Sequence, residues 1–231
     1  PVQKTLEHTG KKEGLVSDTI YVVFKDAAGN TWLTGPSNGI DLIDSAKKII
    51  RHADVAGGLS DDNIQDVKQD MDGLVWLATN RSGIDVFDPK AGTVKYLNNQ
   101  PGLQGPSNRM MVMDNYGRMW IGTNQGIYVA DKKLGTLTSI TTKQGLSSNR
   151  VLSLLEYNGS VIAGTNNKAT IITAPVPGYA EAGTVTPGNE WQIAPLDQSE
   201  VLIRERINAW STDLVTKNGQ YLWGDAGITG I

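Results

Sequence analysis

Short hydrophobic runs alternate with turn-forming residues along most of the chain. The pattern is clearest in residues 58–101, where runs of about five residues fall at 64–70, 74–79, 84–88 and 93–97. Each run is bounded by Gly, Pro, Asn or Asp, and no comparable stretch has the spacing of an amphipathic helix. Such a pattern predicts four short strands joined by tight turns, which is a β-meander.

This unit recurs at a nearly constant interval. A Gly-Leu pair opens each of four copies, at Gly14, Gly58, Gly102 and Gly145, so the spacings are 44, 44 and 43 residues. A less regular fifth copy runs from Arg206 toward the end of the chain. A period in the low forties with four strands per copy is typical of β-propeller blades. We therefore predict an all-β fold, a β-propeller of four-stranded antiparallel blades, with about five blades in this chain.

The prediction treats residues 1–231 as a single β-propeller domain. Blades are expected at approximately 14–57, 58–101, 102–144, 145–196 and 200–231, and residues 1–13 are expected to supply an outer strand. The first strand of each copy reads as largely apolar, which predicts burial between neighbouring blades. After Ala174 a stretch rich in Pro and Gly predicts a loop insertion in the fourth blade. Two arrangements stay open: the chain ends could close a five-bladed ring, or the chain is a fragment of a larger propeller.

The amino-acid composition of the chain limits the kinds of binding partner and cofactor that we expect. The net charge of -3 provides no broad basic field, which argues against nucleic acid as a partner. The chain has no cysteine, so disulfides and thiolate metal sites are excluded. No apolar run has the length of a membrane span, and we expect no membrane contact by this segment. No metal site and no cofactor are expected.

Residues 102–130 and 145–165 carry the pattern Gly-Leu, polar residues, a hydrophobic run and then an acid before a turn glycine. In the first of these segments Trp-Ile-Gly-Thr and Gly-Ile follow the turn. The pattern resembles the two-component-regulator propeller repeat, and the resemblance extends over about four fifths of the chain, weakening after residue 165.

That family forms the periplasmic sensing region of hybrid histidine kinases in Bacteroidetes. The resemblance implies a periplasmic, non-catalytic sensing module that recognises a small molecule or an oligosaccharide derived from glycans. It also implies a homodimer formed through the rest of such a sensor. Kinase and catalytic motifs are missing from the sequence, so we expect this chain not to be an enzyme, although its parent protein could be a histidine kinase.

Several residue types recur at equivalent positions and are therefore expected to serve the fold. An acid three residues before the turn glycine should accept backbone N–H groups of that turn. A tryptophan in the second strand should pack between blades and donate its N–H to a neighbouring blade. The two histidines occupy the same position in successive fourth strands and are expected at the surface. These residues are Asp26, Asp70, Asp114 and Glu156; Trp32, Trp76 and Trp120; and His8 and His52.

The candidate ligand site lies at one end of the blades. In an antiparallel meander, the segment leading into the first strand and the loop between the second and third strands lie at the same end. Both are rich in amide and charged side chains, which suit sugar hydroxyls and carboxylates. The alternative is that these residues serve only turns and caps. The predicted ligand-binding residues are Asp18, Asp62, Asn63, Arg81, Asn108, Arg109, Asn124, Asn149, Arg150 and Asn166.

Two other functions stay open. A propeller lyase would need a channel-facing histidine with a metal, and a glycoside hydrolase would need two carboxylates facing each other. Asp18, Asp61 and Asp62 are the only acids expected at the candidate end, and no catalytic residue is predicted. A scaffold that binds a protein through the same end is the third interpretation.

Overall fold

The computed structural model describes residues 9–44, 49–97, 103, 110–132, 135–176, 190–196, 201–208, 211–216 and 221–224. For residues 49–50 and for the last three ranges only the backbone is described. Several predictions lie outside the described residues: the outer strand near residues 2–6, His8, Asn108, Arg109 and most of the insertion after Ala174.

The described strands form five antiparallel sheets, four of them with four strands each in chain order. Two short 3-10 helices, η1 (Lys11–Glu13) and η2 (Thr142–Gln144), precede the first and fourth sheets. The first sheet contains β1 (Val22–Lys25), β2 (Thr31–Thr34), β3 (Ile40–Ile43) and β4 (Ile49–Ala53). The second contains β5 (Ile64–Gln69), β6 (Val75–Thr79), β7 (Ile84–Asp88) and β8 (Thr93–Tyr96). The third contains β9 (Met110–Met113), β10 (Met119–Thr123), β11 (Gly126–Asp131) and β12 (Thr136–Ile140), and the fourth contains β13 (Val151–Tyr157), β14 (Ser160–Thr165), β15 (Ala169–Thr173) and β16 (Gln192–Pro195).

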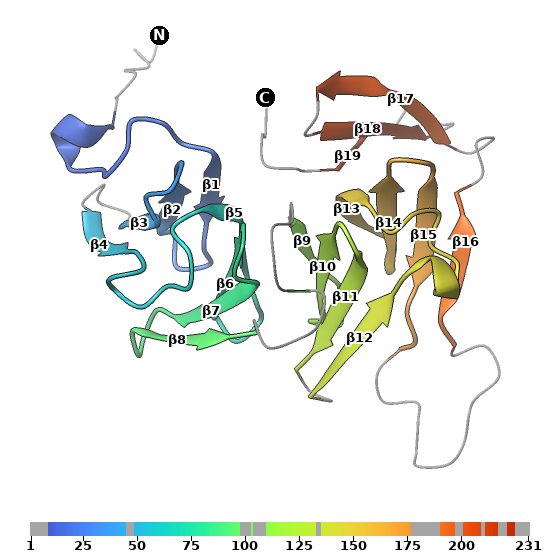
Figure 1. The fold of residues 1–231 in the computed structure, drawn as a ribbon, viewed down its shortest axis with the longest axis horizontal. Coiled ribbons are helices and arrows are strands. Elements are labelled where there is room, and N and C mark those ends of the chain that lie inside the picture. The colour runs from blue at the N-terminus through green and yellow to red at the C-terminus, as the bar shows by residue number, and fades with distance from the viewer. Residues whose placement is uncertain are drawn as a thin grey trace, which may run out of the picture.

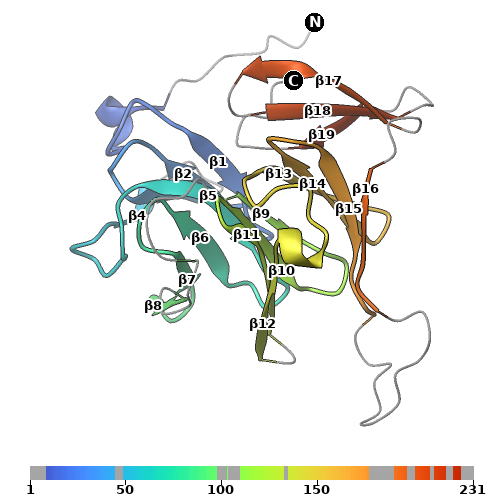
Figure 2. The ribbon, with the colours of Figure 1, turned by 45° about the vertical axis from the view of Figure 1, so that its right-hand side comes forward.

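The sheets follow one another around a common centre (Figures 1 and 2). Their first strands contact each other in sequence, β1 with β5, β5 with β9, and β9 with β13. In Figure 1 these first strands lie toward the middle, whereas β4, β8, β12 and β16 lie on the outside. This is the arrangement of propeller blades, so the predicted all-β propeller fold is confirmed.

The fifth sheet differs from the predicted fifth copy. It contains β17 (Val201–Asn208), β18 (Ser211–Thr216) and β19 (Tyr221–Gly224), in that order. β18 and β19 contact β13. The sheet therefore has three described strands, with β18 in the middle, and it packs on β13 through β18 and β19. The sequence had placed the start of this copy near Arg206, inside β17.

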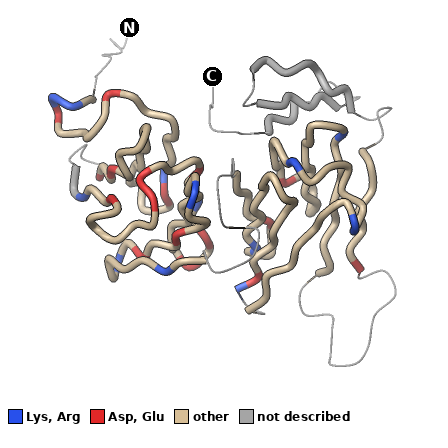
Figure 3. The backbone as a smooth tube through the Cα atoms, in the orientation of Figure 1, with Lys and Arg blue, Asp and Glu red and all other residues tan. Residues whose placement is uncertain are grey.

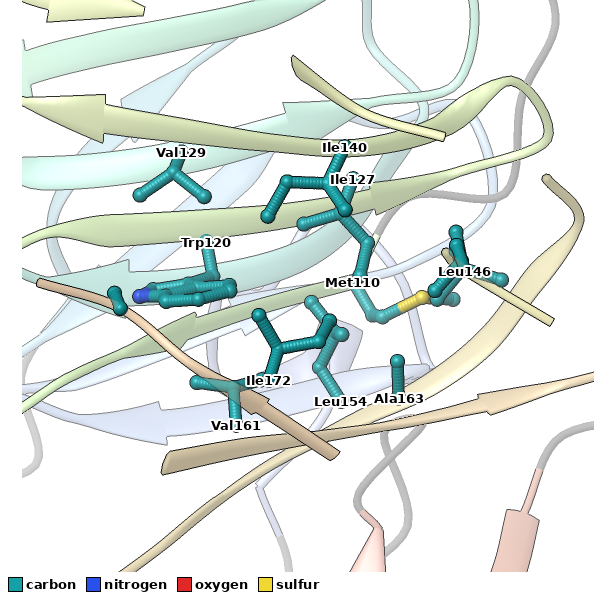
Figure 4. Packing of buried hydrophobic residues seen from close by; sticks show 12 residues of the cluster. Met110, Trp120, Ile127, Val129, Ile140, Leu146, Leu154, Val161, Ala163 and Ile172 are labelled. Carbon is teal, nitrogen blue, oxygen red and sulfur yellow. The ribbon is translucent and has the colours of Figure 1, made fainter. Parts of the chain in front are cut away.

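The core lies between successive sheets. Each of three large buried clusters combines residues of two adjacent sheets. Figure 4 shows the one between the third and fourth sheets, where Trp120 and Ile127 face Leu154, Val161 and Ile172. Burial is deepest in second and third strands: every residue of β6, β10 and β11 is buried.

First strands are less buried than the sequence predicted. In β5 the residues Gln65, Lys68 and Gln69 are only half-buried. A second or third strand is paired at both edges, whereas a first strand is paired at only one edge. Its other edge faces the centre of the propeller, which leaves its polar side chains partly exposed.

The repeated tryptophans do pack between sheets, but their N–H groups do not bond a neighbouring blade. Each indole Nε1 donates to Oδ2 of the repeated aspartate in its own sheet, at 2.8–2.9 Å. The other oxygen, Oδ1, accepts backbone N–H groups of the turn, as predicted. We call this arrangement the Asp–Trp clasp; its three copies are Asp26 with Trp32, Asp70 with Trp76, and Asp114 with Trp120.

The fourth sheet lacks the clasp because Ile162, at the tryptophan position, has no N–H to donate, and its first turn is also shorter. Tyr157 pairs with Ser160, so only Asn158 and Gly159 form the turn, with φ of 50° and 79°. Positive φ at both central positions is the geometry of a two-residue hairpin turn. Glu156 accepts the Gly159 N–H at 2.9 Å, and Ile162 replaces the tryptophan.

Candidate functional site

The predicted meeting of lead-in segments and loops at one end of the sheets is present in the structure. We use "lead-in segment" for the residues between the Gly-Leu pair and the first strand. In the second sheet the Asn80 N–H donates to the Asn63 carbonyl at 2.8 Å, and in the fourth Asn166 donates likewise to Arg150 at 3.3 Å. The Gly39 N–H of the first sheet donates to the Asp62 carbonyl at 2.8 Å, which joins neighbouring sheets. In the second and fourth sheets the lead-in segment and the loop between the second and third strands therefore lie at the same end, and one bond joins this end to the first sheet.

Three of the predicted residues stabilise their own lead-in segment. In each case the side-chain Oδ1 accepts the backbone N–H of the residue seven positions earlier, at 2.6–2.8 Å. The three pairs are Asp18 with Lys11, Asp62 with Val55, and Asn149 with Thr142. One oxygen of each side chain is thus committed to the backbone, which agrees with the turn-and-cap interpretation for that atom.

In the second sheet the acid Asp61 positions the predicted residues around it. Its Oδ1 accepts the Asn63 N–H at 3.0 Å and its Oδ2 accepts the Arg81 N–H at 2.9 Å. Asn63 Oδ1 in turn accepts from Gln65 Nε2 at 2.6 Å. Arg81 is exposed, and its guanidinium forms no hydrogen bond or ion pair with another described residue.

In the fourth sheet Arg150 and Asn166 are both exposed. The Arg150 N–H donates to Ser148 Oγ at 3.2 Å, which fixes its backbone and leaves the guanidinium without a bond to any residue that the structure describes. Beside them Asn167 Nδ2 donates to the Ser147 carbonyl at 3.3 Å. This end of the fourth sheet therefore presents one guanidinium and one amide to solvent.

In the third sheet Asn124 is exposed at the loop between β10 and β11. Thr123 Oγ1 shapes this loop by accepting the Gln125 N–H and donating to the Gly126 carbonyl, both at 2.9 Å. The predicted residues Asn108 and Arg109 of the same sheet lie outside the described residues.

Charge is divided unevenly over this end. The lead-in segments of the first and second sheets carry Asp18, Asp61 and Asp62, whereas the fourth sheet carries Arg150 and Lys168. Figure 3 shows that, among the residues the structure describes, Asp and Glu are concentrated in the first two sheets, whereas Lys and Arg occur throughout. Arg81 lies beside the acids of the second sheet, so a ligand spanning this end would meet cationic groups at both the second and the fourth sheets.

The sequence analysis missed a second set of tethers for the lead-in segments. In the first, second and fourth sheets, the second residue of the third strand accepts the backbone N–H that follows the Gly-Leu pair, at 2.8–3.1 Å. The pairs are Asp41 with Val16, Asp85 with Ser60, and Thr170 with Ser147. Burial raises the pKa of Asp85, and the two hydrogen bonds from Ser60 only partly offset this effect. The 44-residue spacing of the two aspartates was a signal that could have revealed them.

His52 lies at the surface, as the sequence predicted, but its ring also contacts two carboxylates. Its Nδ1 lies 2.8 Å from Oδ1 of the buried Asp41, and its Nε2 lies 3.8 Å from Asp54 Oδ2. The His52 side chain is 29% exposed. Through Asp41 it is connected to the lead-in segment of the first sheet, whose Val16 N–H bonds the same carboxylate.

A buried carboxylate, Asp66, links the first strands of two sheets. Its Oδ2 accepts the Met111 N–H of β9 at 2.6 Å, and its Oδ1 accepts from Lys68 Nζ at 3.0 Å. Burial raises the pKa of Asp66 despite the opposing charge of Lys68. Within the described ranges no group of three or more His, Cys, Asp or Glu side chains could hold a metal ion. Nor does any described helix have the length and apolar character required to cross a membrane.

These features define a propeller with a repeated, loop-built polar end. The family described as two component regulator propeller matches residues 58–81 and 102–125, which are the opening halves of the second and third copies. These two segments therefore match the repeat of that family, which confirms the resemblance found in the sequence. Comparison with curated protein sequences gives no match.

Solved structures share the fold. The extracellular domain assigned to one hybrid two-component system of B. thetaiotaomicron is 22% identical with a TM-score of 0.63, over 87% of this chain and 26% of that one. A second such domain from the same organism is 15% identical with a TM-score of 0.63, over 94% and 32%. A streptogramin B lyase is 16% identical with a TM-score of 0.59, over 92% and 70%. The chain thus spans less than a third of the two sensor domains, and these identities establish a likeness of fold.

Proposed function

We propose that this chain is part of the extracytoplasmic sensing propeller of a hybrid two-component sensor, and that it binds a small polar solute without transforming it. The family repeats and the fold support the class of protein. The observation that supports binding is the exposed guanidinium groups of Arg81 and Arg150, whose backbones are fixed while the groups themselves have no bond among the described residues. The fixed backbones remove part of the ordering cost of binding, and the guanidinium groups, unpaired among the described residues, leave their donors available to a ligand.

The ligand class that fits this end is a glycan-derived oligosaccharide or a similar polyhydroxylated solute. Exposed amides at Asn124 and Asn166 complement sugar hydroxyls, and arginine complements a hydroxyl pair or a carboxylate. The proposed location is the periplasm, and the proposed dimer would form through parts of the sensor outside this chain.

Binding without turnover is favoured over the propeller-enzyme alternative. The carboxylates expected at this end, Asp18, Asp61 and Asp62, each accept backbone N–H groups, which assigns them to loop structure. A glycosidase would need two of them facing each other across a substrate. The likeness to the lyase concerns the fold and supplies no catalytic residue here.

The test is a screen of oligosaccharides and small polar solutes by calorimetry, followed by substitution of the two arginines. Arg150→Ala and Arg81→Ala should each weaken binding by about tenfold or more while the melting temperature stays within about 2 °C, because exposed side chains contribute little to stability. Lys25→Ala, at an exposed position in β1, is the matched control and should leave affinity unchanged. Cleavage products from any bound oligosaccharide would refute the non-catalytic proposal, and unchanged affinity in both arginine variants would refute the site.

A further inference from the structure

One face of the first sheet is bare where the corresponding face of every following four-stranded sheet is covered. The marker is Val23, whose partner in β2 is Leu33, the residue after Trp32. Strand register identifies the equivalent residue in each other sheet, since its partner also follows the tryptophan position. The equivalents are Val67 opposite Leu77, Met111 opposite Ile121, and Leu154 opposite Ala163.

Exposure separates Val23 from its equivalents. Val23 is 65% exposed, whereas Val67, Met111 and Leu154 are 0%, 3% and 4% exposed. Each buried equivalent belongs to a cluster with the tryptophan of the preceding sheet, Trp32, Trp76 or Trp120. The position is therefore built to receive the tryptophan-bearing face of a preceding blade.

Neighbouring side chains on the same face of the first sheet are also exposed or half-buried, whereas the opposite face is buried. Tyr21, two residues before Val23, is 53% exposed, and Leu33 is only half-buried although Leu77 is fully buried. In contrast Val22, which points to the opposite face of β1, is 6% exposed and packs toward the second sheet. Adjacent exposed apolar side chains of this kind mark interaction surfaces.

None of the four four-stranded sheets has its tryptophan-bearing face exposed. Trp32, Trp76 and Trp120 are all buried, and Ile162 in the tryptophan position of the fourth sheet is 2% exposed. A second copy of the chain therefore cannot reproduce the same interface with any of those four sheets.

We propose that the bare face around Tyr21, Val23 and Leu33 is the docking surface for a further blade of the same repeat type, located ahead of the first sheet in the intact polypeptide. That blade would present a tryptophan ring with aliphatic neighbours, as the first sheet presents Trp32 to Val67. Its placement in the same polypeptide agrees with the length of the two sensor domains, of which this chain covers 26% and 32%.

The test uses thiol labelling, which is clean because the chain has no cysteine. Val23→Cys is introduced into the 231-residue chain and into the complete gene product, with Val67→Cys as the matched buried control. In the short chain Val23→Cys should react at the rate of an exposed thiol, and Val67→Cys at least about a hundredfold more slowly, because its reaction needs local opening. In the complete product Val23→Cys should slow to the rate of Val67→Cys.

Every other outcome overturns the proposal. Rapid labelling of Val23→Cys in the complete product means that no blade covers it, and a gene product with nothing ahead of Pro1 removes the proposed occupant. Slow labelling already in the dilute short chain means that its own fifth sheet closes the ring. Protection that appears only with increasing concentration, with a doubled mass in light scattering, means that a second copy covers the face. If Val67→Cys fails to fold by circular dichroism, Met111→Cys is the buried control.

Discussion

The Asp–Trp clasp offers the sharpest test of how the repeats are held together. We choose Trp76, which is 3% exposed and donates to Asp70 Oδ2 at 2.8 Å. Trp76→Ala removes a buried ring from the cluster between the second and third sheets and should cost about 3–5 kcal/mol of unfolding free energy. Trp76→Phe retains most of the ring and removes the N–H donor. Because Lys132 Nζ still donates to the same oxygen at 2.8 Å, this change should cost only about 1–2 kcal/mol.

The acid dependence of Trp76→Phe tests the hydrogen bond specifically. Burial alone would raise the pKa of Asp70, but hydrogen bonds from Lys132, Trp76 and the Leu74 N–H outweigh it, and the pKa is lowered. A lowered folded-state pKa contributes stability above the unfolded pKa of about 3.9, and this contribution is lost as pH falls through the folded value. Removing one donor moves the pKa back upward. The deficit of Trp76→Phe relative to the unmodified chain should therefore be smaller near pH 3 than near pH 7.

Urea unfolding followed by circular dichroism at pH 3 and pH 7 measures the loss of unfolding free energy in each variant and how that loss changes with pH. Trp191→Phe is the matched control, since Trp191 packs edge-on against Trp120 at 5.7 Å and its indole nitrogen has no bond to a described residue. It should cost less than about 1 kcal/mol at either pH. Equal deficits for Trp76→Phe at both pH values, or a cost no larger than that of Trp191→Phe, would refute the clasp as an energetic element.

Two further predictions concern positions that the structure singles out. Gly39 has φ of +70° and an added Cβ would lie 2.1 Å from the Ala53 carbonyl oxygen, whereas Gly29 has φ of +86° with nothing within 4 Å. Gly29→Ala should therefore cost about 1 kcal/mol from the backbone alone and Gly39→Ala at least about 3 kcal/mol, measured by thermal unfolding; equal costs would contradict the steric argument. Burial raises the pKa of Asp85, so ionisation of this group opposes folding at neutral pH. Asp85→Asn can still accept the Ser60 N–H and should stabilise by up to about 1 kcal/mol near pH 7, with the gain shrinking as pH falls and Asp85 itself becomes neutral; a gain that grows in acid would reverse this assignment.

Much of the fold followed from the period of the sequence because each copy repeats both its strands and its turns. The acids before the turn glycines could be assigned to backbone N–H groups because such bonds are local, within four residues. The lead-in residues Asp18, Asp62 and Asn149 could be placed at one end of the blades for the same reason. Their individual bonds, seven residues apart, were not evident from residue type.

Contacts between segments distant in the sequence could not be derived in this way. The bond between His52 and Asp41 depends on the pairing of β4 with β3, so the surface position predicted correctly for this histidine did not reveal its partner. The acceptor of each tryptophan N–H was also predicted wrongly. The indole donates to an aspartate six residues earlier in its own sheet, and this contact depends on how the turn between the two residues folds. In the fourth copy the spacing of Glu156 to the turn glycine matches the others, but the tighter turn changes its register.

By itself the sequence determined that this protein is built from repeated four-stranded units and which end of them gathers polar loops. It did so because periodicity and turn chemistry are properties of neighbouring residues. Only the tertiary structure decided which of those polar atoms are already bonded and which are exposed, since that depends on how the loops fold against each other. It also decided that Val23 is exposed while Val67, Met111 and Leu154 are buried. Equivalent positions in a repeat differ when one of them has no neighbour to pack against.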